Sequence, residues 1–374
     1  MLSRRKLLIL GSSSAMVIGA GYSFWGRHEQ IPFQGPVSEK ENHDTLNAMR
    51  PPKRKRPVIA VLADNLGSET TDFIIPWSVL KRSGVADVYS VALTPDPIQL
   101  MPALSIVPDM SVEQFGKKFP DGADYVIVPA LHDEESPAAI DWINEQSLGG
   151  ATSVGICAGA LTLAHAGVLD GKQATTHWFN IDDLKKISPS ILTQRSRRFV
   201  ADHGVVTTTG VSASLPLSLK LVEAIAGRSF AEKMAMDLGV RDFDQFHLSQ
   251  DFKATSGHLF KGLVNAASIA GHEDLGLPIQ NGMDELSIAF VADAWSRTYR
   301  SQCLTVASSR RIETANGMII IPDKSSNSAG DLEILPVQSS APGKSLGMAL
   351  DEIAKRYDRE TASLVALQLE YDWS

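Results

Sequence analysis

The stretch Val154-Gly155-Ile156-Cys157-Ala158-Gly159-Ala160 decides the fold class, because it ends a buried apolar run and opens a helical segment. Small residues on both sides of Cys157 permit the sharp strand-to-helix turn of a nucleophile elbow. At such a turn the thiol lies at a helix N-terminus, where the helix dipole and free backbone N–H groups stabilise a thiolate. The stretch therefore predicts a reactive cysteine with a pKa below the ordinary value of about 8.5. An inert core thiol is the alternative.

Strand and helix patterns alternate around this turn. Val58–Ala63 is a short unbroken apolar run, which is typical of a strand buried on both faces of a parallel sheet. The alternation predicts an α/β fold, a doubly wound parallel-sheet sandwich of the flavodoxin-like type that carries the nucleophile elbow. Further strands are expected at Val88–Leu93, Ile106–Val107, Tyr125–Val128, Thr152–Ile156 and Val205–Thr209, and helices at Thr70–Arg82, Ala138–Gln146 and Leu217–Ala226.

The last third of the chain repeats the start of this pattern. Gly67–Arg82 recurs as Gly282–Arg297, and Ile106-Val-Pro-Asp109 recurs as Ile320-Ile-Pro-Asp323 at almost the same separation along the chain. Matching motifs at a nearly constant offset indicate an internal repeat. The second copy is too short to complete a sheet and has no equivalent of the elbow cysteine. We therefore expect residues 275–374 to be a truncated, non-catalytic half repeat that docks on the first domain.

The N-terminus has the pattern of a targeting segment. Arg4-Arg5 precedes residues 7–26, which carry no charge, as in a twin-arginine signal peptide. A helix of this length also reaches across a hydrocarbon core of about 30 Å. We expect residues 1–26 to be an export signal or a retained anchor, so that the protein is periplasmic or membrane-attached and facing the periplasm. Residues 27–56 are expected to form a linker and residues 241–274 a helical connector.

Composition and charge narrow the function classes. The chain has 35 basic and 43 acidic residues, a net charge of −8, which argues against a nucleic-acid-binding protein. Two cysteines, Cys157 and Cys303, exclude a disulfide framework and a cysteine-rich metal site. We expect Cys303 to be a core residue in an apolar strand. The scattered histidines disfavour metal binding, and no cofactor is expected.

Three motifs together resemble one known family. They are Gly155-Ile-Cys157-Ala-Gly-Ala160, Ala166-Gly-Val-Leu-Asp-Gly171 and Ala174-Thr-Thr-His177-Trp178. The chain is similar through them to the ThiJ/PfpI superfamily, which has the class I glutamine amidotransferase-like fold. The similarity covers about residues 57–240. It is strongest to the branch of isonitrile hydratases and amidotransferase-like domains of AraC-type regulators, whose helix-turn-helix domain is replaced here by the half repeat.

The resemblance implies a set of site residues. The family pairs its cysteine with an acid four residues before a proline, and Asp72 stands four residues before Pro76. Asp72 is thus implied as the acid beside Cys157, and His177 as the histidine that supports the site. The same resemblance implies that a small-molecule substrate or ligand is bound near Ala158, Ala130, Leu131 and Ser212.

Several positions depart from the family pattern and leave three function classes open. Ala130-Leu131 stands where the family has Gly-Gly, Ala158 where the hydratases often have Thr, and Pro216 where an Asp is common. The first class is a cysteine-dependent hydrolase or hydratase acting on a small C–N-containing substrate. The second is a non-catalytic ligand-binding or redox-sensing module. The third is a scaffold whose repeat mediates assembly. We also expect a homodimer.

Overall fold

The structure of this protein is a computed structural model. It describes residues 37–49, 51–247, 252–267, 271–328, 330, 332–336 and 341–373. The predicted signal or anchor and the first residues of the predicted linker lie outside this part of the chain. Within it, no helix combines the length and apolar character that a membrane crossing requires.

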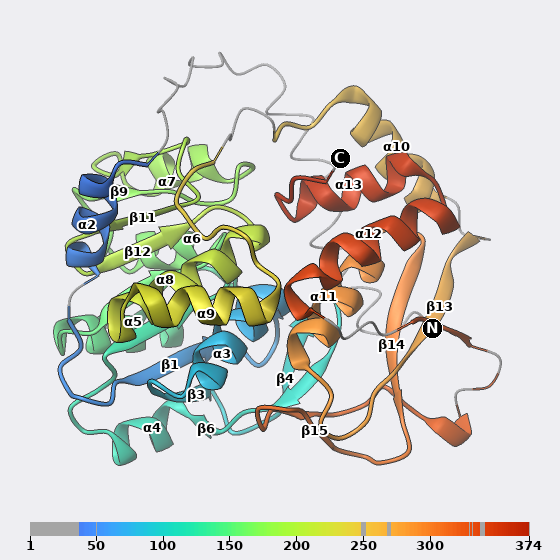
Figure 1. The fold of residues 1–374 in the computed structure, drawn as a ribbon, viewed down its shortest axis with the longest axis horizontal. Coiled ribbons are helices and arrows are strands. Elements are labelled where there is room, and N and C mark those ends of the chain that lie inside the picture. Colours follow the sequence, from blue (N-terminus) through green and yellow to red (C-terminus); the bar gives the residue numbers. More distant parts are fainter. Residues whose placement is uncertain are drawn as a thin grey trace.

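The first unit is built on a seven-stranded sheet (Figure 1). Every pairing in this sheet is parallel except that of β11 with β12. The prediction of an α/β fold with a mostly parallel sheet is confirmed. In order across the sheet, the strands are β11 (Phe199–Asp202), β12 (Val205–Thr208), β8 (Thr152–Gly155), β7 (Tyr125–Val128), β1 (Val58–Ala63), β3 (Asp87–Ala92) and β6 (Met110–Ser111).

The central strand β1 sends alternate side chains into two separate apolar cores, as the two-residue period of a strand requires. Ile59 and Val61 belong to one core, and Ala60 and Leu62 belong to the other. Helices therefore cover both faces, which explains the unbroken apolar run in the sequence. The first core is covered by α3 (Thr70–Ser83), α8 (Ser214–Ala226) and α9 (Arg228–Leu238), and the second by α4 (Val112–Lys118), α5 (Pro137–Leu148), α6 (Gly159–His165) and α7 (Ile181–Ile187).

The second unit, orange to red in Figure 1, lies beside the first and has a smaller parallel sheet. Cys303 is a buried residue of this sheet, as predicted. The strands in spatial order are β17 (Lys324–Ser325), β14 (Ser301–Ala307), β13 (Glu273–Pro278) and β18 (Glu333–Ile334). Its helices are α11 (Glu285–Ser296), α12 (Ser345–Arg356) and α13 (Arg359–Gln368), and α10 (Ser256–Ala267) lies in the predicted connector.

A third sheet joins the two units. Ile319 and Ile320 of β16 pair with Val107 and Ile106 of β5 in antiparallel register. Helices α3 and α11 also pack against each other, so that the first apolar core continues from one unit into the other. In spatial order, this sheet holds β15 (Ile312–Glu313), β16 (Ile319–Ile320), β5 (Ser105–Val107), β4 (Ile98–Met101) and β2 (Ser68–Glu69). A separate pair is formed by β9 (Gln173–Ala174) and β10 (Leu192–Thr193).

The expectation that all of residues 27–56 form a linker is wrong for the described part. Glu39–Ala48 forms helix α2, whose N-terminus is capped by the Ser38 side chain. Met49 at its end is fully buried, and its carbonyl accepts a hydrogen bond from Thr152 Oγ1 at 2.8 Å. The sequence did not predict this helix because its composition is polar, and the composition is polar because few of its residues are buried.

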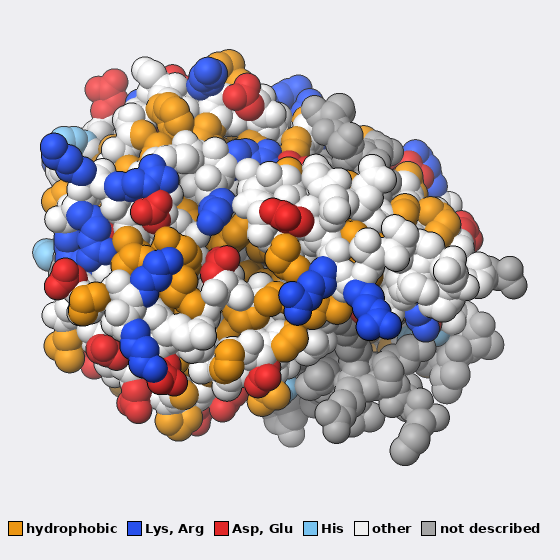
Figure 2. All heavy atoms as spheres, turned by 90° about the horizontal axis from the view of Figure 1, so that it is seen from below, with side chains coloured by type: hydrophobic (Ala, Val, Ile, Leu, Met, Phe, Trp, Pro, Cys, Tyr) orange, Lys and Arg blue, Asp and Glu red, His pale blue; other side chains and the backbone are white. Residues whose placement is uncertain are grey.

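The surface carries charges of both signs. On the face shown in Figure 2, Lys and Arg side chains are interspersed with Asp and Glu side chains. Apolar side chains lie between them. Interspersed charges give a weak net field over this face.

Candidate active site

The elbow predicted around Cys157 is present. Strand β8 ends at Gly155 and α6 begins at Gly159, while Cys157 itself has a φ of 54°, in the left-handed region. The turn brings the start of α6 onto the end of β7. A Cβ added to Gly159 would lie 2.0 Å from the Val128 carbonyl oxygen, so only glycine fits.

Two threonines fix the backbone of the elbow. The Cys157 N–H donates a hydrogen bond to Thr208 Oγ1 at 3.0 Å, and Thr176 Oγ1 donates one to the Cys157 carbonyl at 2.8 Å. Thr208 ends strand β12, and Thr176 immediately precedes His177. These two hydrogen bonds stabilise the left-handed backbone conformation of Cys157, which is unfavourable for a residue with a side chain. Cys157 is 8% exposed.

Asp72 lies in the first turn of α3 and is fully buried. Its Oδ2 accepts a long hydrogen bond from the Ala130 N–H at 3.4 Å, and its Oδ1 has no hydrogen-bond partner among the described residues. Burial, followed by the nearby Glu69 carboxylate, holds the pKa of Asp72 well above its ordinary range. The carboxyl group therefore retains its proton to a higher pH than a free carboxyl group does, which suits it to donate that proton.

The structure contradicts the prediction of a low thiol pKa. Burial raises the pKa of Cys157 well above its ordinary value, and Asp72 and Glu69 raise it further. The Ala158 backbone N–H lowers the pKa, as the helix N-terminus argument requires, but it does not outweigh the other effects. The residues next to Cys157 indicate the helix N-terminus, but the desolvation that a tightly packed elbow imposes depends on distant residues.

His177 is also buried near the elbow. Its Nδ1 accepts a hydrogen bond from the Phe179 N–H at 3.4 Å, and its ring lies against Gly210. Burial lowers the pKa of His177, with Glu370 acting in the opposite direction. The imidazole is thus neutral at physiological pH and able to accept a proton.

Of the residues implied as ligand-binding, three lie next to Asp72 or the Cys157 thiol, and the fourth has a structural hydrogen bond. Ala130 and Leu131 follow strand β7 beside Asp72, and this segment is pinned by the Glu69 N–H, which donates to the Ala130 carbonyl at 2.8 Å. Ala158 contacts the thiol through its N–H. The Ser212 hydroxyl, in contrast, donates to the Glu370 carbonyl at 2.5 Å and is engaged in holding the chain.

Four charged residues near the site were not predicted from the sequence. Glu69 Oε2 accepts a hydrogen bond from the Asp72 N–H at 2.5 Å, and its Oε1 pairs with Arg297 at 2.5 Å. Arg297 also pairs with the buried Asp293 at 2.9 Å. Glu370 is buried and has a φ of 50°. No local motif marks Arg297, Asp293 or Glu370, because all three lie in the last third of the chain, far from Cys157 in sequence.

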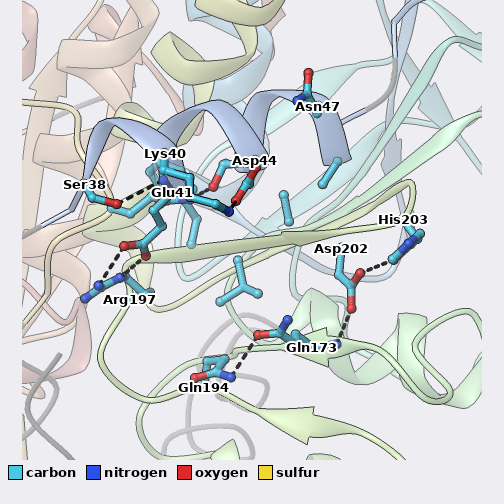
Figure 3. A pocket seen from close by; sticks show the side chains of 16 residues that line it. Ser38, Lys40, Glu41, Asp44, Asn47, Gln173, Gln194, Arg197, Asp202 and His203 are labelled. Atoms are coloured by element: carbon cyan, nitrogen blue, oxygen red, sulfur yellow. Dashed lines mark hydrogen bonds and ion pairs between the residues drawn. The ribbon is translucent and has the colours of Figure 1, made fainter.

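A wide hollow lies away from these groups. It has a volume of about 770 Å³ and lies between α2 and β11 (Figure 3). The figure shows ion pairs along it, between Arg197 and Glu41 and between Lys40 and Asp44. None of Cys157, Asp72 and His177 lines it. The candidate active site and this hollow are therefore separate features.

A smaller apolar cavity of about 40 Å³ lies closer to the site. Trp178 and Phe179, which follow His177, form one wall, and side chains of α10 and α13 form the other. The second unit thus reaches the neighbourhood of the histidine. Within the described residues, no group of three or more His, Cys, Asp or Glu side chains is arranged to hold a metal ion.

Comparisons with known proteins find a family match over the part of the chain that carries the elbow. The family described as the DJ-1/PfpI family matches residues 57–224. The Parkinson disease protein 7 homolog of Danio rerio is 28% identical over 47% of this chain and 94% of its own. Isonitrile hydratase of Pseudomonas putida is 30% identical over 32% of this chain and 49% of its own.

A solved structure and a regulator are also similar to this chain. The crystal structure of Drosophila melanogaster DJ-1beta aligns with 50% of this chain and 100% of its own, at 25% identity and a TM-score of 0.44. A transcriptional regulator of Pseudomonas aeruginosa is 34% identical over 27% of this chain and 30% of its own. The family match covers both the elbow and Asp72, so residues 57–224 of this chain are a DJ-1/PfpI family domain.

Proposed function

We propose that this protein is a cysteine-dependent hydrolase or hydratase acting on a small substrate with a reactive carbon–nitrogen bond. The observation that carries the proposal is the left-handed Cys157 on its elbow, beside a buried Asp72 with a free carboxyl oxygen. Strained nucleophiles and acids with strongly perturbed pKa values gather at catalytic sites. The similarity to isonitrile hydratase of Pseudomonas putida supports this substrate class.

The three groups have complementary protonation states for such a reaction. The Cys157 sulfur forms a bond to the electrophilic carbon and its proton passes to neutral His177, while the carbon–nitrogen π pair moves to nitrogen. In a nitrile the nitrogen takes the proton of Asp72. In an isonitrile the terminal carbon takes it, because that carbon would otherwise be left divalent. Water then adds to the carbon and returns a proton to Asp72, and the departing sulfur recovers its proton from His177. The net reaction adds one water molecule to the substrate.

The direct test is turnover of a panel of small isonitriles, nitriles and amides by the Cys303→Ala protein. Product formation is followed by mass spectrometry, and intact-protein mass identifies a covalent adduct. We expect product with at least one class of compound and an adduct on Cys157. A Cys157→Ser protein that turns over the same compound would contradict the proposal.

The raised thiol pKa gives a specific prediction for reactivity. Only the thiolate reacts with iodoacetamide, and the pKa of Cys157 lies above its ordinary value. The alkylation rate of Cys303→Ala protein should therefore keep rising from about pH 7 to about pH 10, without a plateau near the ordinary pKa of about 8.5. A plateau below about pH 8 would show that the helix N-terminus outweighs burial.

A non-catalytic ligand-binding or redox-sensing module is the second candidate. The raised pKa of Cys157 favours it, because a thiol that stays protonated is a slow nucleophile. Ala158 also lacks the hydroxyl common in hydratases. This candidate predicts saturable binding of small molecules, or oxidation of Cys157 by peroxide, with no product from the panel.

We further propose that the protein is exported through its twin-arginine segment. Supporting this are Arg4-Arg5 and the uncharged residues 7–26 that follow. Replacing both arginines by lysine in a fusion of residues 1–56 to a reporter should abolish export, because this route reads the arginine pair. Unchanged periplasmic reporter activity would point to the general secretory route.

We also propose that residues 275–374 are a half repeat of the first unit. Supporting this, Asp109 Oδ2 accepts hydrogen bonds from the N–H and hydroxyl of Ser90, and Asp323 Oδ2 accepts the same two from Thr305. The two pairs occupy matching positions in the two copies of the repeated sequence. Equivalent contacts at equivalent positions are expected when one supersecondary unit is duplicated.

A further inference from the structure

Two ion pairs between the units are reciprocal: each joins a residue of one unit to a residue of the other, and the residues of the two pairs occupy equivalent positions in the repeat. Arg82 of α3 forms an ion pair with Asp284, which caps α11. Arg297, which ends α11, forms one with Glu69, which caps α3. Arg82 and Arg297 are equivalent in the repeat, and so are Glu69 and Asp284. The arginine of each unit thus forms an ion pair with the N-cap carboxylate of the other unit's helix.

The strands between the units show the same exchange. Ile106 and Ile320 occupy equivalent positions, and they pair directly across the antiparallel junction of β5 and β16. An interface in which position i contacts j and j contacts i is isologous, the arrangement of a twofold-symmetric dimer. The second unit therefore meets the first as a partner subunit does in a twofold dimer.

We propose that the second unit takes the place of a partner subunit within one chain and covers the α3 face of the first unit. It completes the Cys157 site with Arg297 and Glu370, which act as positioning residues. This inference rests on the reactive cysteine of the proposed function. It assigns a role to a unit that carries no elbow of its own. It also means that the expected homodimer must use a surface other than the α3 face.

Arg297 acts on the site through the acids of α3. Its guanidinium joins Glu69 and Asp293, and Glu69 in turn accepts the hydrogen bond of the Asp72 N–H. Thr71 donates a hydrogen bond to Asp293 Oδ2 at 3.3 Å, which closes the cluster. Without the guanidinium, Glu69 would be a partly buried negative charge next to Asp72 and the thiol. Such an unpaired charge opposes ionisation of its neighbours.

Glu370 acts on the two loops that flank the elbow. Its Oε2 accepts hydrogen bonds from the Gly210 N–H at 2.7 Å and the Trp178 N–H at 3.2 Å. Its Oε1 pairs with His247 at 2.8 Å. One buried carboxylate just after α13 therefore ties the His177 loop to the Gly210 loop. Its left-handed backbone shows that the surrounding contacts determine its position.

The pseudosymmetry supplies a matched control for the test. Arg82→Met and Arg297→Met each remove one interface ion pair, but only Arg297 adjoins the acids beside Cys157. The experiment measures thermal unfolding and the pH profile of iodoacetamide alkylation of Cys157, in full-length Cys303→Ala protein. The titratable and charged groups around the thiol are Asp72, Glu69, His177, Glu370, Asp293 and Arg297.

We expect both variants to lower the melting temperature to a similar extent. Arg297→Met should also slow alkylation at pH 8 by about threefold to tenfold, because an uncompensated Glu69 raises the pKa of the thiol. Arg82→Met should stay within about twofold of its parent. Arg297→Lys should restore part of the rate, because lysine restores the charge but cannot bridge Glu69 and Asp293 as the guanidinium does. Glu69→Gln should accelerate alkylation, which loss of stability does not explain.

Two results would overturn the inference. Identical pH profiles for Arg297→Met and Arg82→Met, with no acceleration in Glu69→Gln, would reduce the second unit to a structural support and leave the proposed function intact. If Arg297→Met does not fold, the Glu69→Gln profile is the test: faster alkylation supports the inference, and an unchanged alkylation rate overturns it. A parent protein whose Cys157 is not alkylated at any pH would overturn the inference and the proposed function together.

Discussion

Replacing Asp72 by Asn should lower turnover by about 10²–10⁴, the usual contribution of general acid–base catalysis, while Cys157 remains open to alkylation. Asn has nearly the shape of Asp and keeps a hydrogen-bond donor, but it has no proton to give to the substrate nitrogen. The carboxyl group that it replaces is fully buried and has a raised pKa, so it retains its proton to a higher pH than a free carboxyl group does. The measurement is kcat on a compound from the panel, compared with the alkylation rate of the same sample.

Asp124→Asn is the matched control. Asp124 is also buried, but it lies before strand β7, at the end of the parallel sheet opposite the elbow. It accepts hydrogen bonds from the Lys53 and Val58 N–H groups, and so its loss should lower stability without changing kcat per folded molecule. If Asp72→Asn retains full turnover, proton donation by Asp72 is wrong. If both variants lose turnover equally, the effect is structural.

Gly159→Ala should destroy the elbow at a cost of about 3 kcal/mol or more, at the upper end of what overpacking causes. The added methyl group would lie 2.0 Å from the Val128 carbonyl oxygen and 2.8 Å from Pro129 backbone atoms. Backbone of a central strand does not move aside as a flexible side chain does. The domain must therefore separate α6 from β7, which displaces Cys157. Thermal unfolding and Cys157 alkylation report the two consequences separately.

Gly116→Ala is the corresponding control, since Gly116 lies within α4 and a Cβ there would meet no atom within 4 Å. This change should raise stability by roughly 0.5–1 kcal/mol, because alanine has the higher helix propensity. If the two substitutions change the free energy of unfolding in opposite directions, the loss at Gly159 is due to the steric clash and not to a general effect of replacing glycine. A Gly159→Ala protein with the melting temperature of its parent would contradict the packing of the elbow.

Much of the first unit was predictable from local patterns. The runs at 58–63, 125–128 and 152–156 were expected as buried strands, and each lies in the central sheet with nearly the predicted bounds. Their apolar character is continuous because helices cover both faces, and this leaves a signal in any short window. Helix α2 gave no such signal, since its composition is polar and its stability depends on contacts with distant strands.

The candidate site was predictable where a motif is local. The glycines and alanines around Cys157 predict the elbow because backbone sterics act over a few neighbouring residues. The thiol pKa was predicted with the wrong sign. Its main determinant is burial, and burial depends on how β7, α3 and β12 pack around the elbow rather than on the residues next to Cys157.

The α/β class, the position and conformation of the elbow, and the helix turn that carries Asp72 follow from local sequence, because each depends on residues close together in the chain. The charges that surround the thiol follow from the packing of the two units. Arg297 and Glu370 reach the site from the second unit, although they lie far beyond Cys157 in the chain. Electrostatic energies depend on distance in space and on access of water, and the order of residues along a chain specifies neither until the units have packed together.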